Sequence, residues 1–295
     1  GFNRLRMGVQ DFNKEVQQKV NREQDEAFIF SVVARAREVG FHSTSIDLIY
    51  GLPKQTKESF AFTLKKVIEL SPDRLSVFNY AHLPNLFAAQ RKIKDEDLPL
   101  AEEKLEILQE TITTLTTNGY QFIGMDHFAK PDDELAVAQR QGILHRNFQG
   151  YTTHEECDLL GMGVSAISML GDHYAQNEKV LKEYYARVNS EGHALWRGLS
   201  LTHDDCIRRD VIKTLICNFH LNFTEIENLY QIDFQDYFKE DLALLAPMAE
   251  DGLVEISAEK IQVTPRGRLL IRNICMCFDT YLRNQMRQRQ FSRVI

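Results

Sequence analysis

Segments with the hydrophobic pattern of a strand alternate with segments of helical periodicity in the N-terminal half of the chain. We predict strands at 4–10, 45–50, 75–80 and 120–128. We predict helices at 22–39, 57–70 and 101–117, and Thr56 is the expected N-cap of the second helix. Strands that alternate with helices of this length predict an α/β fold with a parallel sheet and right-handed crossovers. Only about four strands are visible, so a barrel needs further strands from outside this chain.

The pattern changes after residue 141. Residues 142–202 are mixed, with a loop at 147–153, a turn at 161–163, a helix near 178–189 and an extended segment at 195–201. Beyond them we predict helices at 204–217, 224–229 and 234–250, a hairpin of strands 253–256 and 261–264, and a last helix from Pro265 to about residue 287. This succession resembles a winged-helix module.

The composition is that of an ordinary globular protein, with 43% hydrophobic residues, 26% charged residues and a formal net charge of −7. An acidic chain is a poor match for nucleic acid or an anionic membrane, and no apolar run is long enough for a membrane span. The five cysteines are odd in number and irregularly spaced, which indicates reduced thiols in a cytosolic protein. Cys275 and Cys277 lie in an apolar segment, where core packing is favoured over metal binding.

In parallel α/β folds, polar residues at the carboxyl ends of strands and in the following loops form the active face. This rule selects Gln10, Asp47, the segment after Asn79, and Asp126-His127. Asp47 either binds a ligand or lies at a solvated edge, and the sequence favours neither reading. Gln10 is either a site residue or an ordinary loop residue.

Three further features have two readings each. Arg22 opens a predicted helix, where the dipole disfavours a cation, so it either has an outside partner such as a carboxylate or lies on the surface. His127 beside Asp126 is either an acid–base pair or a structural hydrogen bond. Tyr50 and Tyr80 each precede a turn, and they either line a flat aromatic substrate or cap the sheet.

Consecutive segments along the whole chain resemble the oxygen-independent coproporphyrinogen III oxidases, most closely the enterobacterial type. The segments that carry the resemblance are 8–12, 21–24, 46–56, 75–84, 120–129, 147–153, 159–168 and 269–279. These enzymes belong to the radical S-adenosylmethionine family, whose CxxxCxxC motif is absent here, and the chain begins inside a predicted strand. We therefore expect a C-terminal part of such an enzyme, with no metal ligands of its own. The cluster loop, a Gly-rich loop and a strand that ends in a carboxylate are expected on the part that precedes it.

The resemblance implies the oxidative decarboxylation of two propionates of coproporphyrinogen III to vinyl groups, without oxygen, to give protoporphyrinogen IX in haem biosynthesis. A [4Fe–4S] cluster and S-adenosylmethionine supply a radical that takes a hydrogen from the propionate, and an electron donor and acceptor complete the reaction. The resemblance also implies a cytoplasmic monomer. Catalytic residues stay unassigned, and Tyr80, His82 and His127 are candidates for the substrate side.

The cofactor contacts implied by the resemblance fall on six residues. Four of them match contacts to a first S-adenosylmethionine: Gln10, Arg22, Asp47 and, through its backbone, Ala81. Gln149 and Ile167 match contacts to a second S-adenosylmethionine. Gly161 and Gly163 would let the backbone approach that cofactor closely.

The domains expected from pattern and resemblance are the remainder of a radical S-adenosylmethionine barrel (1–141), a linking region with second-cofactor contacts (142–202) and a mostly helical, winged-helix-like domain (203–295) that covers the barrel mouth. On its own the chain should fold poorly, because a barrel without its first strands exposes sheet edges.

Two other functions remain open. A haem chaperone of the same superfamily would bind haem without decarboxylating a substrate, although the segments 147–153 and 271–278 favour the oxidase. A DNA-binding regulator is suggested only by the winged-helix-like end of the chain. Haem titration and salt-dependent DNA retention distinguish them.

Overall fold

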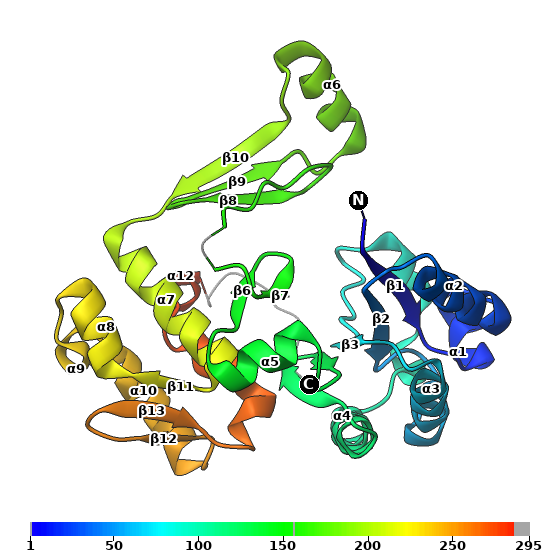
Figure 1. Cartoon of the computed structure of the whole chain (residues 1–295), viewed down its shortest axis with the longest axis horizontal. Coiled ribbons are helices and arrows are strands. Elements are labelled where there is room, and N and C mark those ends of the chain that lie inside the picture. The colour runs from blue at the N-terminus through cyan, green and yellow to red at the C-terminus, as the bar shows by residue number, and fades with distance from the viewer. Residues whose placement is uncertain (1, 156, 286–295) are drawn as a thin grey trace. The chain divides into compact units, whose positions relative to one another are not determined.

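The computed structural model describes residues 2–155 and 157–285, which form two compact units (Figure 1). The described parts of these units are residues 2–140 with Gln285 and, except for residue 156, residues 141–284. No helix in these described ranges is both long enough and apolar enough to cross a bilayer.

The first unit contains a five-stranded sheet in the order β1-β2-β3-β5-β4. Its strands are β1 (Arg4–Gln10), β2 (Ser43–Tyr50), β3 (Arg74–Asn79), β4 (Gln121–Gly124) and β5 (His127–Ala129). β1, β2 and β3 pair in parallel, as the alternation of strands and helices predicts. β5 is antiparallel to both β3 and β4.

The first unit also contains helices. They are α1 (Lys14–Lys19), α2 (Glu26–Glu38), α3 (Lys57–Leu70), α4 (Ala101–Thr117) and α5 (Glu134–Gln141), with 3-10 turns at Ala88–Lys92 and Asp95–Asp97. α3 has its predicted bounds because Thr56 and Ser59 form a capping box and Ser71 ends the helix in a left-handed conformation.

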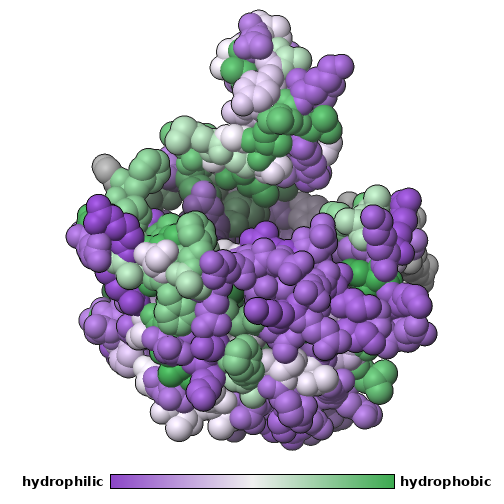
Figure 2. Space-filling view, turned by 90° about the vertical axis from the view of Figure 1, so that its right-hand side faces the viewer, coloured by the Kyte–Doolittle hydropathy of each residue, from purple (hydrophilic) through white to green (hydrophobic). Residues whose placement is uncertain are grey.

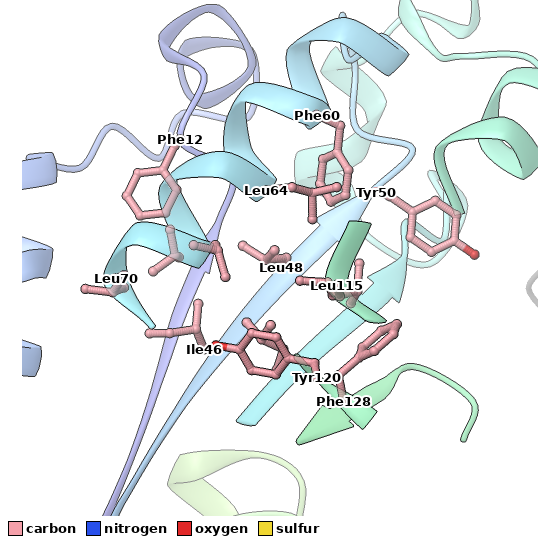
Figure 3. Packing of buried hydrophobic residues seen from close by; sticks show 14 of the residues in the cluster. Phe12, Ile46, Leu48, Tyr50, Phe60, Leu64, Leu70, Leu115, Tyr120 and Phe128 are labelled. Carbon is pink, nitrogen blue, oxygen red and sulfur yellow. The ribbon is translucent and has the colours of Figure 1, made fainter. Parts of the chain in front are cut away.

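The core of the first unit lies between the sheet and its helices (Figure 3). Ile46, Leu48 and Tyr50 alternate along β2 and are buried, and Phe60 and Leu64 of α3 belong to the same cluster. Each such side chain contributes roughly 1.5–3 kcal/mol relative to an exposed one. The surface on the side where α1 to α3 lie in Figure 1 is largely hydrophilic (Figure 2), because these helices bury only one face.

Two predictions for the first unit are wrong. The helix expected at 22–39 begins only at Glu26, where Asp25 is the N-cap, and a separate helix, α1, precedes it. The strand expected at 120–128 is a hairpin of two strands, because Met125 has a φ of 54° and turns the chain back.

The second unit combines a hairpin, a small sheet and a helical module. The hairpin is β6 (His145–Asn147) with β7 (Gly150–Thr152), and the antiparallel sheet β10-β9-β8 contains β8 (Ile167–Leu170), β9 (His173–Asn177) and β10 (Leu195–Ser200). α6 (Leu181–Glu191) joins β9 to β10 (Figure 1). The helical module contains α7 (His203–Asn218), α8 (Phe223–Tyr230), α9 (Phe234–Tyr237), α10 (Lys239–Glu250), α11 (Ile271–Met276) and α12 (Thr280–Gln285).

The helical module differs from its prediction at three points. The single helix expected at 234–250 is interrupted at Phe238, which separates α9 from α10. A short strand, β11 (His220–Asn222), joins the expected hairpin of β12 (Val254–Ile256) and β13 (Lys260–Val263) in a sheet ordered β11-β13-β12. The helix expected from Pro265 is replaced by a 3-10 turn at Gly267–Leu270, then α11 and α12. Gly267 lies so close to Leu253 that an added Cβ would be 1.9 Å from the Leu253 carbonyl oxygen. The end predicted near residue 287 lies outside the described residues.

Candidate functional site

A row of paired residues crosses the first-unit sheet on the face opposite its helices. Gly8 of β1 is the register partner of Asp47, which pairs with Ser76 of β3, which in turn pairs with His127 of β5. Paired residues of neighbouring strands lie on the same face of a sheet. Since the neighbours of Asp47 in β2 are buried in the helix-covered core, this row faces the other way. We call it the polar row.

Asp47 forms an ion pair within this face. The Arg6 Nε atom lies 2.9 Å from both carboxylate oxygens of Asp47, and an Arg6 terminal nitrogen lies 3.5 Å from the Ser76 hydroxyl. The Asp47 side chain is 18% exposed, so the solvated-edge reading is wrong. Asp47 also lies inside β2 rather than at its carboxyl end, and its partner Arg6 was not among the predicted residues.

Gln10 and Arg22 meet beside Gly8. Gln10 ends β1 at a β-bulge with a φ of 70°, and its side-chain oxygen is buried with no hydrogen-bond partner among the described residues. An Arg22 guanidinium nitrogen donates to the Gly8 carbonyl at 2.8 Å. A Cβ at Gly8 would lie 2.7 Å from Gln10 Nε2 and 3.6 Å from Arg22. The side chains of Gln10 and Arg22 therefore converge next to the polar row.

The prediction that Arg22 opens a helix is wrong, because Arg22 lies in the loop between α1 and α2. Its described partner is a backbone carbonyl rather than a carboxylate. The hydrogen-bonding capacity of a guanidinium, five N–H donors, exceeds this single contact.

Ala81 lies in the loop that follows β3. Gln90 fixes this loop, since its side-chain amide donates to the Ala81 carbonyl at 3.0 Å and accepts from the Leu83 N–H at 2.5 Å. The Tyr80 hydroxyl is 3.4 Å from His82 Nδ1, and burial raises the pKa of Tyr80. Gln90 was not predicted, because only the folded loop shows that it bridges two backbone groups.

The candidate His127 packs edge-on against Phe78, with ring centroids 6.1 Å apart. Its acid–base pairing with Asp126 stays a prediction.

In the second unit, Gln149 and Ile167 lie on different elements. Gln149 is exposed in the turn between β6 and β7, and its N–H donates to Asn147 at 2.8 Å. Ile167 begins β8 and lines a pocket of about 320 Å³ together with Phe148 and Tyr174, whose ring centroids are 5.0 Å apart. Phe148, which precedes Gln149, therefore lines the same pocket as Ile167, whereas Gln149 does not.

Gly161 has a structural role that differs from the predicted one. An added Cβ at Gly161 would lie 2.6 Å from the Ile167 carbonyl oxygen, so the close approach is to the chain's own β8 backbone. Asn177 holds the turn by donating to the carbonyls of Gly161 and Gly163 at 3.3 and 2.9 Å. Gly163 has a φ of +99° and open space around it.

Two family models match parts of the chain. The model of the radical SAM superfamily matches residues 1–67, and the model of the HemN C-terminal domain matches residues 201–270. A protein of Thermostichus vulcanus named oxygen-independent coproporphyrinogen III oxidase is 49% identical over 296 residues, which cover all of this chain and 91% of that protein. The chain belongs to the oxygen-independent coproporphyrinogen III oxidase family.

The relative of the same name from Escherichia coli K12 is 73% identical over the whole chain, which spans 65% of its length. A solved structure titled as coproporphyrinogen III oxidase (HemN) from Escherichia coli, a radical SAM enzyme, matches 96% of the chain at 74% identity with a TM-score of 0.93. The predicted fold is confirmed: the chain is the C-terminal part of a radical SAM (β/α) barrel followed by a mostly helical domain.

A buried polar network supports the converging residues of this oxidase-family chain. The Asp11 carboxylate, next to Gln10, accepts from Thr63 Oγ1 at 2.5 Å, from Gln55 Nε2 at 2.5 Å and from the Asn13 N–H at 2.6 Å. Burial raises the pKa of Asp11, although these three hydrogen bonds oppose the shift. Gln55 also accepts from the Gly51 N–H at 2.5 Å, so one network joins the ends of β1 and β2.

The described residues fit S-adenosylmethionine, the general cofactor of the radical SAM superfamily. The buried, unpartnered oxygen of Gln10 is an acceptor, and the free N–H groups of Arg22 suit a carboxylate. The same residues do not fit a [4Fe–4S] cluster, since no group of three metal-ligating side chains occurs among them.

Proposed function

We propose that this chain forms the nucleoside-facing and C-terminal parts of an enzyme that decarboxylates coproporphyrinogen III to protoporphyrinogen IX in haem biosynthesis. The observation that carries the proposal is the convergence of Gln10 and Arg22 at Gly8, beside the polar row that contains Asp47. The chain-wide 73% identity to an oxidase of that name supports the same reaction.

The cofactors supply the radical chemistry, and the residues of this chain bind and orient them. Arg22 would hold the methionine carboxylate of S-adenosylmethionine by charge-assisted hydrogen bonds. Gln10 and Asp47 would bind the nucleoside, and Ala81 would contribute through its backbone. Arg6 orients Asp47, because its Nε atom lies 2.9 Å from both carboxylate oxygens.

A second S-adenosylmethionine is part of the proposal. Gln149 and Ile167 would contact it, and the Gly161–Asn177 contacts would fix the backbone at Ile167. On the substrate side, Tyr80, His82 and His127 are the proposed contacts.

The proposed protein is a cytoplasmic monomer that uses an electron donor and an electron acceptor, and it binds neither nucleic acid nor a membrane. Residues 1–141, 142–202 and 203–295 would serve as barrel, linking region and covering domain.

The reaction is tested in an extended protein, in which the N-terminal part of the Escherichia coli relative precedes this chain. After anaerobic reconstitution with iron and sulfide, we expect the conversion of coproporphyrinogen III to a divinyl product that depends on S-adenosylmethionine. Stable haem binding without any vinyl product would instead favour the chaperone.

A further inference from the structure

The second unit contains a larger pocket, of about 550 Å³, that the proposed cofactor contacts do not use. Its wall combines the β6–β7 hairpin, the small sheet, α7 and residues 278–281. Much of the lining is apolar, with side chains such as Phe148, Met169, Leu199, Ile212 and Ile216. A pocket of this size and character suits an apolar ring system rather than a small ion.

Four cationic side chains also line this pocket. They are Arg146, Arg208, Arg209 and Lys213, against the two carboxylates of Asp205 and Asp279. Three of the four come from α7, where positions 208, 209, 212, 213 and 216 share one face at helical spacing.

Two of these cations already have partners inside the protein. Arg208 lies 2.8 Å from both Asp204 and Asp241, and Arg209 lies 3.3 Å from Asp210 and 3.4 Å from Asp172. Their charges are compensated, so they serve the packing of α7.

The other two cations, Arg146 and Lys213, form no ion pair within 4 Å among the described residues. One terminal nitrogen of Arg146 is buried without a hydrogen bond, and its guanidinium lies 5.0 Å from the centre of the Tyr151 ring. Lys213 has no ion pair or hydrogen bond within the described chain. Burial, followed by the charge of Arg209, lowers the pKa of Lys213, and the more distant charges of Asp210 and Glu155 oppose this shift. Half-buried cations without a contacting counter-ion are costly, and an anion in the pocket would offset that cost.

We infer that this pocket binds a carboxylate carried on an apolar ring, with Arg146 and Lys213 as its ligands. The assignment of that carboxylate to a propionate of coproporphyrinogen III rests on the proposed function. A propionate arm matches both features of the pocket, because it joins a charged end to a hydrophobic ring. Neither residue was predicted from the sequence.

The test is a fluorescence titration of the extended protein with coproporphyrin III, the oxidised and unreactive form of the substrate. Lys213→Gln and Arg146→Gln should each weaken binding of the free acid ten-fold or more. The tetramethyl ester of coproporphyrin III has the same ring without the charges, and the variants should bind it as the wild type does. Lys213→Arg should restore binding of the acid, which separates loss of charge from loss of folding.

Lys182→Gln, at an exposed lysine of α6, is the matched control and should change nothing. Equal affinity of wild type and both variants for the free acid would overturn the inference, as would equal loss of acid and ester binding. A wild type that forms the vinyl product while both variants bind normally would refute the pocket and leave the proposed function intact. If the wild type binds coproporphyrin III through Lys213 but forms no product, the proposed decarboxylation is refuted and the inferred carboxylate pocket is supported.

Discussion

The two units handle buried charge in opposite ways. On the sheet face of the first unit, the Asp47 carboxylate of the polar row is paired with Arg6. The neutral side-chain oxygen of Gln10 beside it is buried without a hydrogen-bond partner among the described residues. In the large pocket of the second unit, Arg146 has a buried nitrogen without a hydrogen bond, and Lys213 forms no ion pair with the described residues. The first arrangement suits a polar ligand held by directional hydrogen bonds, and the second suits an anion.

The largest effect is expected from Arg22→Ala, which removes the charged donor of the first unit. The variant of the extended protein should lose about 1.5–3 kcal/mol of binding free energy for S-adenosylmethionine, the range for a hydrogen bond to a charged group. Isothermal calorimetry measures this loss directly. Arg35→Ala, on an exposed arginine of α2, is the control. Unchanged affinity in Arg22→Ala would remove Arg22 from the site.

The variant Lys213→Gln tests whether the first-unit site and the second-unit pocket bind different ligands. It should bind S-adenosylmethionine as the wild type does while losing affinity for coproporphyrin III, and Arg22→Ala should show the reverse. Variants that lose both ligands together would mean that the two sites are not separate.

The variant Asp11→Asn tests the buried polar network next to Gln10. Because burial raises the pKa of Asp11, its contribution to stability is fully present below the unfolded pKa and is lost as pH rises through the folded pKa. The variant keeps a neutral side chain at every pH, so the stability of the wild type relative to the variant should be highest at low pH. The difference should shrink towards neutral pH. Urea unfolding at several pH values measures it, with Asp251→Asn as an exposed control, and a difference that grows with pH would contradict the account.

An element could be predicted from the sequence when the residues that set its bounds lie next to it in the chain. α3 was predicted with its bounds because Thr56, Ser59 and Ser71 lie next to the helix that they cap. The β4–β5 hairpin was missed because Met125, rather than glycine or asparagine, adopts the left-handed turn. β11 has only three residues, and its pairing with β13 crosses a long sequence separation.

Contacts of the candidate site that join residues far apart in the sequence were missed for the same reason. The resemblance supplied Gln10, Arg22 and Asp47, but the Arg6 partner of Asp47 is 41 residues away in sequence and only the parallel register brings them together. Gly161 was correctly singled out as a point of close approach, yet the sequence could not tell a ligand from the chain's own backbone.

The smallest expected effect concerns Cys217, a reporter next to the second-unit cations. Burial raises the pKa of Cys217 to about 12, and the charges of Arg146 and Lys213 oppose this shift. Iodoacetamide at pH 8 should therefore label the exposed Cys157 first and Cys217 only slowly. Labelling of Cys217 should become slower still in Lys213→Gln, as mass spectrometry of the peptides would show. Faster labelling in a folded variant would place Lys213 away from the thiol.

Hydrogen exchange with and without S-adenosylmethionine tests the central claim most directly, because it locates the ligand without changing a side chain. In the extended protein, the account predicts slower exchange in the Arg22 loop (residues 20–25) and in the Ala81 loop when the cofactor binds. Peptides of α10 (Lys239–Glu250) should be unaffected. Binding that is proven by calorimetry but leaves both loops unprotected would contradict the proposed site.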